Sequence, residues 1–166
     1  DELKDSLFIF GQGIDSIRYE LGDIPKINGD AEDIKILVIN LVKNAIEARR
    51  EGQSLLLTVK SWKSESHVCF SITDNGSGIE EARVKDLWDS GETTKEGGSG
   101  IGLQAIKRIA DEHRAQIRVD SEMGVGTIFT LEFPDILIAK EEVADENNVF
   151  SSRNISGPSV VGKSGS

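Results

Sequence analysis

The sequence predicts one α/β domain, with antiparallel hairpins on one side and helices on the other, followed by a tail. Two segments, about 30–52 and 100–113, repeat apolar residues at the spacing of a helix. Two others, 54–74 and 115–133, each consist of a strand pattern, a polar turn and a second strand pattern. The chain has 166 residues, of which 37% are hydrophobic, and this is enough for one core.

At the N-terminal end, residues 2–11 are expected to form a short amphipathic helix. Residues 14–21 and 24–27 are expected to form short strands. Pro25 indicates that the second of these lies at a sheet edge, because proline cannot donate to a ladder.

The next segment is the clearest helix in the chain. Either Asp30 or Asp33 can cap its start, and Gly52 can end it. Its apolar residues follow the helical spacing without a gap: Ile34, Leu37, Val38, Leu41, Val42, Ala45 and Ile46.

The rest of the body alternates hairpins and helices. Strands at 54–62 and 67–74 are joined by a polar turn, and strands at 115–121 and 126–133 by a turn with two glycines. Between the hairpins we expect a short helix near 80–87, a polar loop to about 98 and a second long helix at 100–113.

Composition excludes several function classes. The formal net charge of −10 disfavours nucleic acid and an anionic membrane surface as partners. The single cysteine, Cys69, allows no internal disulfide and is expected to be an inert strand residue. No apolar run approaches 18 residues and no signal peptide is visible, so we expect a cytoplasmic domain, although its parent protein could be anchored in a membrane.

Residues 140–166 are acidic and then rich in serine and glycine, which predicts a flexible tail or linker. Residues 157–164 fit the phosphate-loop pattern GxxxxGKS. That motif needs a strand before it and a helix after it, and only two residues follow. A flexible tail is therefore the preferred interpretation, and the start of another domain is the alternative.

Three polar features interrupt the apolar patterns, and the first lies on the long helix. Asn40, Asn44 and Glu47 form a stripe beside its apolar face. Because asparagine is a mediocre helix former, one interpretation is a solvated flank. The other is a metal site, since a neutral amide oxygen is a hard ligand for Mg²⁺ when phosphates balance the charge of the metal.

The second feature is DNGSGI, residues 74–79, at the end of a predicted strand. The apolar residues of that strand and Asp74 alternate onto the core face, so the carboxylate points inward. A buried carboxylate needs donors, and the exocyclic amine of a base would supply one, while Gly76 and Gly78 let a ring approach the backbone. The alternative is a tight turn that Asp74 caps.

The third feature is GGSGIGLQAI, residues 97–106, which has four glycines within six residues and then an apolar run. This pattern favours phosphate bound by backbone N–H groups at the start of a helix. A dinucleotide-binding loop is disfavoured, because GxGxxG is not met and the loop does not follow the first strand of a βαβ unit.

Together, and in this order, these segments resemble the motifs of the GHKL superfamily: gyrase B-type subunits, MutL-type repair proteins, heat-shock chaperones and sensor histidine kinases. NLVKNAIEA (40–48) resembles the N box, DNGSGI the G1 box and GGSGIGL the G2 box. LWDSGETTK (87–95) and GVGTIFTLEFP (124–134) resemble the lid region and closing strand of histidine kinases. The resemblance covers about residues 1–135.

The resemblance implies the Bergerat fold, a two-layer α/β sandwich with a mixed, mostly antiparallel sheet packed against helices. ATP and Mg²⁺ would lie between the helices and the sheet, under a mobile lid. The chain would then consist of a histidine-kinase-like ATP-binding catalytic domain, residues 1–139, and the tail, residues 140–166.

The resemblance also implies roles for residues. Asn44 is expected to bind Mg²⁺, and Asp74, helped by Thr127, to accept the adenine N6 amine. Asn40 and Lys95 are expected to act at the catalytic step. Further nucleotide-binding residues are expected along the base, in the lid and at the phosphates: Gly76, Gly78, Ile79, Thr93, Thr94, Lys95, Gly98, Ser99, Gly100, Ile101, Gly102 and Leu103.

Asn40 separates the subclasses of the superfamily. The hydrolysing branches and the anti-sigma-factor kinases usually have glutamate there as a general base. An amide cannot take a proton from water, so Asn40 favours histidine kinases, whose imidazole acceptor is nucleophilic when neutral. The expected activity is transfer of the γ-phosphoryl group of ATP to a histidine on a dimerisation and phosphoacceptor domain, with the receiver domain of a response regulator downstream. The alternatives are an ATP-binding module that sequesters a protein partner, as anti-sigma factors do, and a GHKL ATPase.

The two histidines of the chain are not expected to be the acceptor. His67 lies in a hairpin, and His113 ends a helix, where a cation suits the dipole. Neither lies on an exposed helix before an acidic residue, as the acceptor of the family does. The acceptor is therefore expected on a preceding domain of the parent protein.

The chain departs from the family pattern at three places. The HGG of the family is His113-Arg114-Ala115, at a cost of about 1 kcal/mol if a left-handed residue is needed there. Glu92 replaces an aromatic residue before TTK, and Glu47 replaces a lysine that contacts phosphate in many relatives. Lys95 is then the expected cation of the lid.

Overall fold

The computed structural model describes residues 13–88 and 101–138, which form five strands, three α-helices and one 3₁₀ helix. The strands are β1 (Ser16–Leu21), β2 (Leu56–Lys63), β3 (His67–Asp74), β4 (Gln116–Glu122) and β5 (Gly126–Pro134). The helices are α2 (Ala31–Glu47), α3 (Glu81–Asp86), α4 (Ile101–Glu112) and η1 (Asp135–Leu137). The predicted helix at 2–11 and the tail lie outside the described residues.

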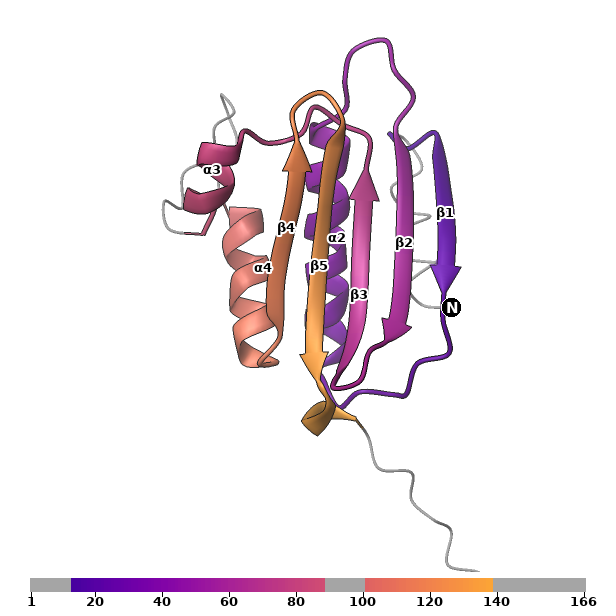
Figure 1. The fold of residues 1–166 in the computed structure, drawn as a ribbon, viewed down its shortest axis with the longest axis vertical. Helices are drawn as coiled ribbons and strands as arrows, with labels where there is room; N and C mark the ends of the chain where they lie inside the picture. The colour runs from indigo at the N-terminus through magenta and orange to yellow at the C-terminus, as the bar shows by residue number, and fades with distance from the viewer. Residues whose placement is uncertain (1–12, 89–100, 139–166) are drawn as a thin grey trace, which may run out of the picture.

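The strands form one sheet in the order β1-β2-β3-β5-β4 (Figure 1). Antiparallel pairing within β2–β3 and within β4–β5 confirms both predicted hairpins. The hairpins join through antiparallel β3 and β5, while β1 pairs with β2 in parallel at one edge. The sheet is therefore mixed and mostly antiparallel, as expected.

The helices form a second layer on one face of this sheet. Figure 1 shows α2 behind β3 and β5, with α4 beside β4. The largest fully buried side chains come from both layers: Leu37, Leu41, Leu55, Leu57, Ile72, Ile106, Ile109 and Leu131. This arrangement confirms the predicted two-layer α/β sandwich. No helix in the described ranges has the length and apolar character to cross a membrane.

Helix α2 begins at the first of its two candidate caps. The Asp30 carboxylate accepts hydrogen bonds from the backbone N–H groups of Glu32 and Asp33, at 2.8 and 3.2 Å. These bonds satisfy two of the donors that a helix start leaves without partners. Asp30 is therefore the N-cap, and Asp33 lies inside the first turn.

The end of α4 is fastened to the start of α2 by His113. Its Nδ1 donates to the carbonyl of Ile109 at 2.8 Å, and its Nε2 accepts the backbone N–H of Asp30 at 3.1 Å. The ring is 7% exposed. The N–H of Asp30 can only donate and the carbonyl of Ile109 can only accept, so His113 links the two helix ends through both ring nitrogens.

Two local expectations are wrong. Residues 24–27 form no strand, since only Ile27 makes an isolated bridge, to Ile138. The segment follows the single parallel edge strand, and Pro25 cannot donate to a ladder. Helix α2 ends at Glu47 rather than at Gly52. The carbonyl of the capping residue Ala48 accepts the N–H of Ser77, so it is not paired with an N–H one helical turn further along the chain.

Arg114 adopts the left-handed conformation that the missing glycine suggested, with φ of 52°. Its N–H bonds to the carbonyl of Asp111, and that of Ala115 to Ala110, which is the Schellman end of a helix. Because glycine avoids the steric cost of this conformation, we expect Arg114→Gly to raise the free energy of unfolding by about 0.5–1 kcal/mol. Urea denaturation measures this change. Arg114→Ala, the control, removes the same side chain but keeps Cβ, so an equal gain there would contradict the explanation.

Candidate nucleotide-binding site

The first and third predicted motifs meet where α2 passes the start of α4. Asn40 donates from Nδ2 to the carbonyl of Ile36 at 2.8 Å, which fixes the orientation of its amide. A Cβ on Gly102 would lie 3.1 Å from Oδ1 of Asn40 and 3.8 Å from Oδ1 of Asn44. Both amide oxygens therefore lie close to the first turn of α4, and the absence of a side chain at Gly102 permits this approach.

Asn44 carries a buried polar group that lacks a partner. Its Nδ2 makes no hydrogen bond to any described residue, although the atom is inaccessible to solvent. An unsatisfied buried donor is costly, and a phosphate oxygen would satisfy it. Among the described residues, no group of three or more His, Cys, Asp or Glu side chains could hold a metal ion. A metal ion here would therefore need phosphate oxygens as ligands in addition to the amide oxygen of Asn44.

The second motif forms a buried corner at the end of β3. Asp74 is 7% exposed, which confirms that its carboxylate faces inward. Its Oδ1 accepts the N–H of Gly76 at 2.8 Å, so the carboxylate also caps the turn. Thr127, which is 3% exposed, is the strand partner of Asp74 on β5. Two buried polar side chains thus lie next to each other on the helix side of the sheet.

The glycines of this corner let backbone segments approach one another. A Cβ on Gly76 would lie 2.6 Å from the Ala48 carbonyl oxygen, and one on Gly78 would lie 2.0 Å from that of Glu122. The loop after β3 is therefore pressed between the end of α2 and the β4–β5 turn. The sequence analysis explained these glycines by the approach of a base ring, whereas in the structure the backbone of this chain itself lies against both of them.

Two side chains that the sequence did not single out hold this corner. The Arg50 guanidinium donates to the carbonyl of Gly124 at 2.6 Å and to that of Asn75 at 3.1 Å. Asn75 accepts the N–H of Leu56 and donates to the carbonyl of Ser54. No spacing rule identifies such residues, because their partners are backbone atoms distant in sequence.

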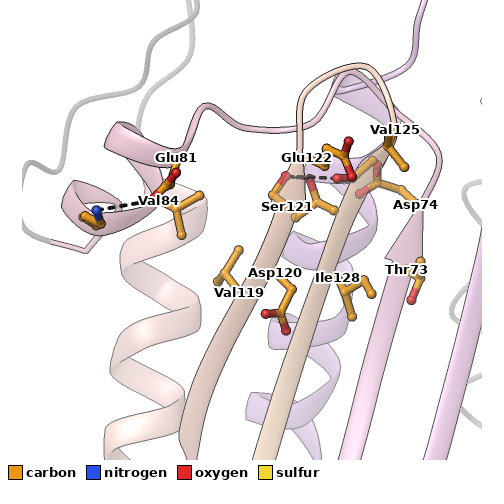
Figure 2. Close-up of a pocket in the computed structure, with 13 residues that line it drawn as sticks. Thr73, Asp74, Glu81, Val84, Val119, Asp120, Ser121, Glu122, Val125 and Ile128 are labelled. Carbon is orange, nitrogen blue, oxygen red and sulfur yellow. Dashed lines mark hydrogen bonds and ion pairs between the residues drawn. The ribbon is translucent and has the colours of Figure 1, made fainter.

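A hollow of about 520 Å³ reaches this corner from the side of α3. It lies between α3 and the β4–β5 hairpin, and Figure 2 shows Asp74, Ser121 and Glu122 near the turn of that hairpin. Asp74, Gly126 and Thr127 line one end of the hollow, and Glu81, Val84 and Lys85 come from α3. The hollow is also lined by Thr73, Asp120 and Ile128, so residues from both faces of the sheet contribute to it.

The other predicted site residues divide into two groups. Ile79, Gly102 and Leu103 lie among the described residues, where Ile79 and Leu103 pack against the core, and Ile101 begins α4. The lid and glycine residues lie outside the described part of the chain: Thr93, Thr94, Lys95, Gly98, Ser99 and Gly100.

The sequence of the chain matches a known protein family over the segment that forms this site. The sequence profile of the histidine kinase-, DNA gyrase B-, and HSP90-like ATPases matches residues 29–136. The chain belongs to this ATPase family. The match includes α2, the Asp74 corner, α4 and the β4–β5 hairpin.

Curated relatives of this ATPase domain are sensor kinases. It is 38% identical to sporulation kinase E of Bacillus subtilis over 126 residues, which are 76% of this chain and 17% of that kinase. It is 37% identical to the histidine-protein kinase AtoS of Escherichia coli over 114 residues, 68% of this chain and 18% of that one. The chain thus spans less than a fifth of the length of either relative.

Solved structures agree with the sequence comparison. The catalytic domain of histidine kinase ThkA superposes with a TM-score of 0.68 and 28% identity, over 80% of this chain and 89% of that one. The mycobacterial sensor histidine kinase MprB shares the fold, with a TM-score of 0.67 and 22% identity over 80% of this chain and 92% of that one. The chain is an ATPase-family domain of the type found in sensor histidine kinases.

Proposed function

We propose that this domain binds ATP with Mg²⁺ and donates the γ-phosphoryl group to a histidine on the dimerisation and phosphoacceptor domain of its parent protein. Asn40 is the observation that carries the proposal. Its amide has no basic lone pair for a water proton, and Nδ2 is already committed to the carbonyl of Ile36. A domain with this residue near the phosphates is suited to a nucleophile that needs no base, and neutral imidazole is such a nucleophile.

The proposed binding mode uses both ends of the site. The adenine ring enters the corner of Asp74 and Thr127, where the buried carboxylate accepts the N6 amine. The phosphates lie at the start of α4, whose first turn carries no acidic residue and whose dipole favours anions. Lys95 and the other lid residues close over them in this proposal.

Mg²⁺ would be held by the Oδ1 of Asn44, and when bound it neutralises charge on the phosphates. The Nδ2 of the same amide would donate to a phosphate oxygen, which satisfies the atom that is otherwise buried without a partner. In the transfer step the imidazole nitrogen forms a bond to the γ-phosphorus, and the bond from that phosphorus to the bridging oxygen of ADP breaks.

The parent protein supplies the remaining partners in this proposal. A receiver domain of a response regulator takes the phosphoryl group from the histidine, which makes the protein part of a two-component system. The domain works in the cytoplasm without contacting nucleic acid or the membrane, and its net charge of −10 supports this.

We expect that the domain alone neither labels itself nor hydrolyses ATP at a useful rate, but labels an added acceptor domain from its own parent. His67 lies at the start of β3, and His113 is buried between two helices, so neither is suited to accept. Transfer will be slow, because the tether that raises the local concentration is missing. The test uses radiolabelled ATP and an acceptor domain with its histidine intact or replaced.

Acid-labile label that appears only on the acceptor domain with its histidine intact would support the proposed kinase activity. Fast phosphate release by the domain alone, abolished by Asn40→Ala, would assign it to the hydrolysing branches instead. Tight ATP binding with neither label nor hydrolysis would favour a module that sequesters a partner.

We also propose that residues 140–166 are dispensable for nucleotide binding. The family match ends at residue 136, before this segment begins, and the segment is acidic and then rich in serine and glycine, which is not the composition of a packed domain. A chain that ends at Lys140 should bind ATP like the full chain in calorimetric titration, and so should full-length Lys163→Ala. If Lys163→Ala abolished binding, the motif in the tail would be the site and the proposed one would fail.

A further inference from the structure

The Ser121 hydroxyl connects three segments at the base corner. It accepts the backbone N–H of Ile79 at 2.8 Å, and it lies 3.0 Å from the carbonyl oxygen of Gly126 and 2.9 Å from the hydroxyl of Thr127. Ser121 is on β4, where it faces the same side of the sheet as Val119 and lines the hollow of Figure 2. It is not among the residues that the family motifs indicate.

The hydrogens of this cluster can be assigned by counting. A serine hydroxyl has one hydrogen and two lone pairs. The N–H of Ile79 can only donate, so it occupies one lone pair of Ser121. The carbonyl of Gly126 can only accept, so it takes the one hydrogen of Ser121. The contact between the hydroxyls of Ser121 and Thr127 is then possible in one direction, with Thr127 as the donor.

In this hydrogen-bond arrangement, Thr127 presents only acceptors to the corner. Its only hydroxyl hydrogen is committed to Ser121, so toward a ligand Thr127 offers lone pairs and no donor. Thr127 is the strand partner of Asp74, whose carboxylate also accepts. Both side chains are buried, so a ligand group that finds acceptors on both sides must itself be a donor.

We propose that Ser121 is a specificity-determining positioning residue that makes Thr127 an acceptor, so that the corner selects a 6-aminopurine over a 6-oxopurine. The proposal rests on nucleotide binding at this corner. A 6-amino group donates a hydrogen to the corner, whereas a 6-oxo group places another acceptor against acceptors. Without Ser121, the Thr127 hydroxyl can rotate and donate to the 6-oxo group.

The test is the ratio of the affinities for ADP and IDP, measured by calorimetric titration with Mg²⁺ present. Ser121→Ala should lower the preference for ADP by about fivefold, the value of one reversed hydrogen bond. Loss of the bond to Ile79 affects both nucleotides alike, so a purely structural role would leave the ratio unchanged and would overturn the proposal. Ser77→Ala, the same exchange in the adjoining loop, should leave the ratio as in the unmodified chain.

Thr127→Val supplies the second arm. It removes the hydroxyl and keeps the shape, so adding Ser121→Ala to it should not change the ratio any further. A further change in the double variant would show that Ser121 acts without Thr127 and would overturn the proposal. If the unmodified chain bound neither nucleotide, the proposed function would fail and this inference with it, whereas binding with an unchanged ratio in Ser121→Ala defeats the inference alone.

Discussion

Asp74→Asn is expected to weaken ATP binding by more than about tenfold, because a hydrogen bond to a charged group contributes about 1.5–3 kcal/mol. The carboxylate is buried at the end of β3, beside Thr127. Its Oδ1 accepts the N–H of Gly76, and the asparagine oxygen can keep this bond, so the turn should survive. The other carboxylate oxygen becomes an NH₂ group, which opposes the N6 amine of adenine with a donor.

Calorimetric titration with ATP and Mg²⁺ measures the loss, and thermal unfolding confirms that the variant is folded. Asp135→Asn is the control, because it removes one negative charge just after the far end of β5, where Asp135 pairs with Lys63 on the surface. It should bind like the unmodified chain. Equal affinities for Asp74→Asn and the unmodified chain would remove Asp74 from the site.

Gly78→Ala is expected to lower the free energy of unfolding by at least about 3 kcal/mol, because a conformational cost and a backbone clash add together. Gly78 has φ of +72°, which disfavours any residue with a Cβ. The added Cβ would also lie 2.0 Å from the carbonyl oxygen of Glu122, a backbone atom that cannot rotate away. Relief requires the loop after β3 to separate from the β4–β5 turn, which would also open the base corner.

Gly124→Ala separates the two costs. Gly124 has nearly the same φ, +75°, but a Cβ there would meet no atom within 4 Å. We expect it to lose about 1 kcal/mol, the conformational cost alone. Urea denaturation of both variants gives the comparison. Equal losses would mean that the close approach at Gly78 does not stabilise the corner.

The sequence predicted most of the secondary structure because the periodic patterns are strong. The apolar spacing of α2 and the alternation of apolar residues in both hairpins predict which face of each element meets the core. The predictions that were wrong concern segments whose patterns are short. Residues 24–27 carry a strand composition, but the sheet offers them only the single bridge from Ile27 to Ile138.

The candidate site could be predicted in part. The motifs identified Asp74 and Asn44, and the inward alternation of β3 correctly predicted that the Asp74 carboxylate is buried. The roles of these residues toward ATP stay predictions. Arg50 and Asn75 could not be found, because their partners are backbone carbonyls and N–H groups, and any sequence supplies such groups.

By itself, the sequence determined that two amphipathic helices alternate with two hairpins along the chain. It also determined the order of the amide, carboxylate and glycine motifs that these elements carry. Only the tertiary structure decided which of these meet: Gly102 against Asn40, and Ser121 against Thr127 and Ile79. The reason is physical. Periodicity depends on neighbours along the chain, whereas a hydrogen-bond direction depends on every donor and acceptor that the fold brings within 3 Å or so.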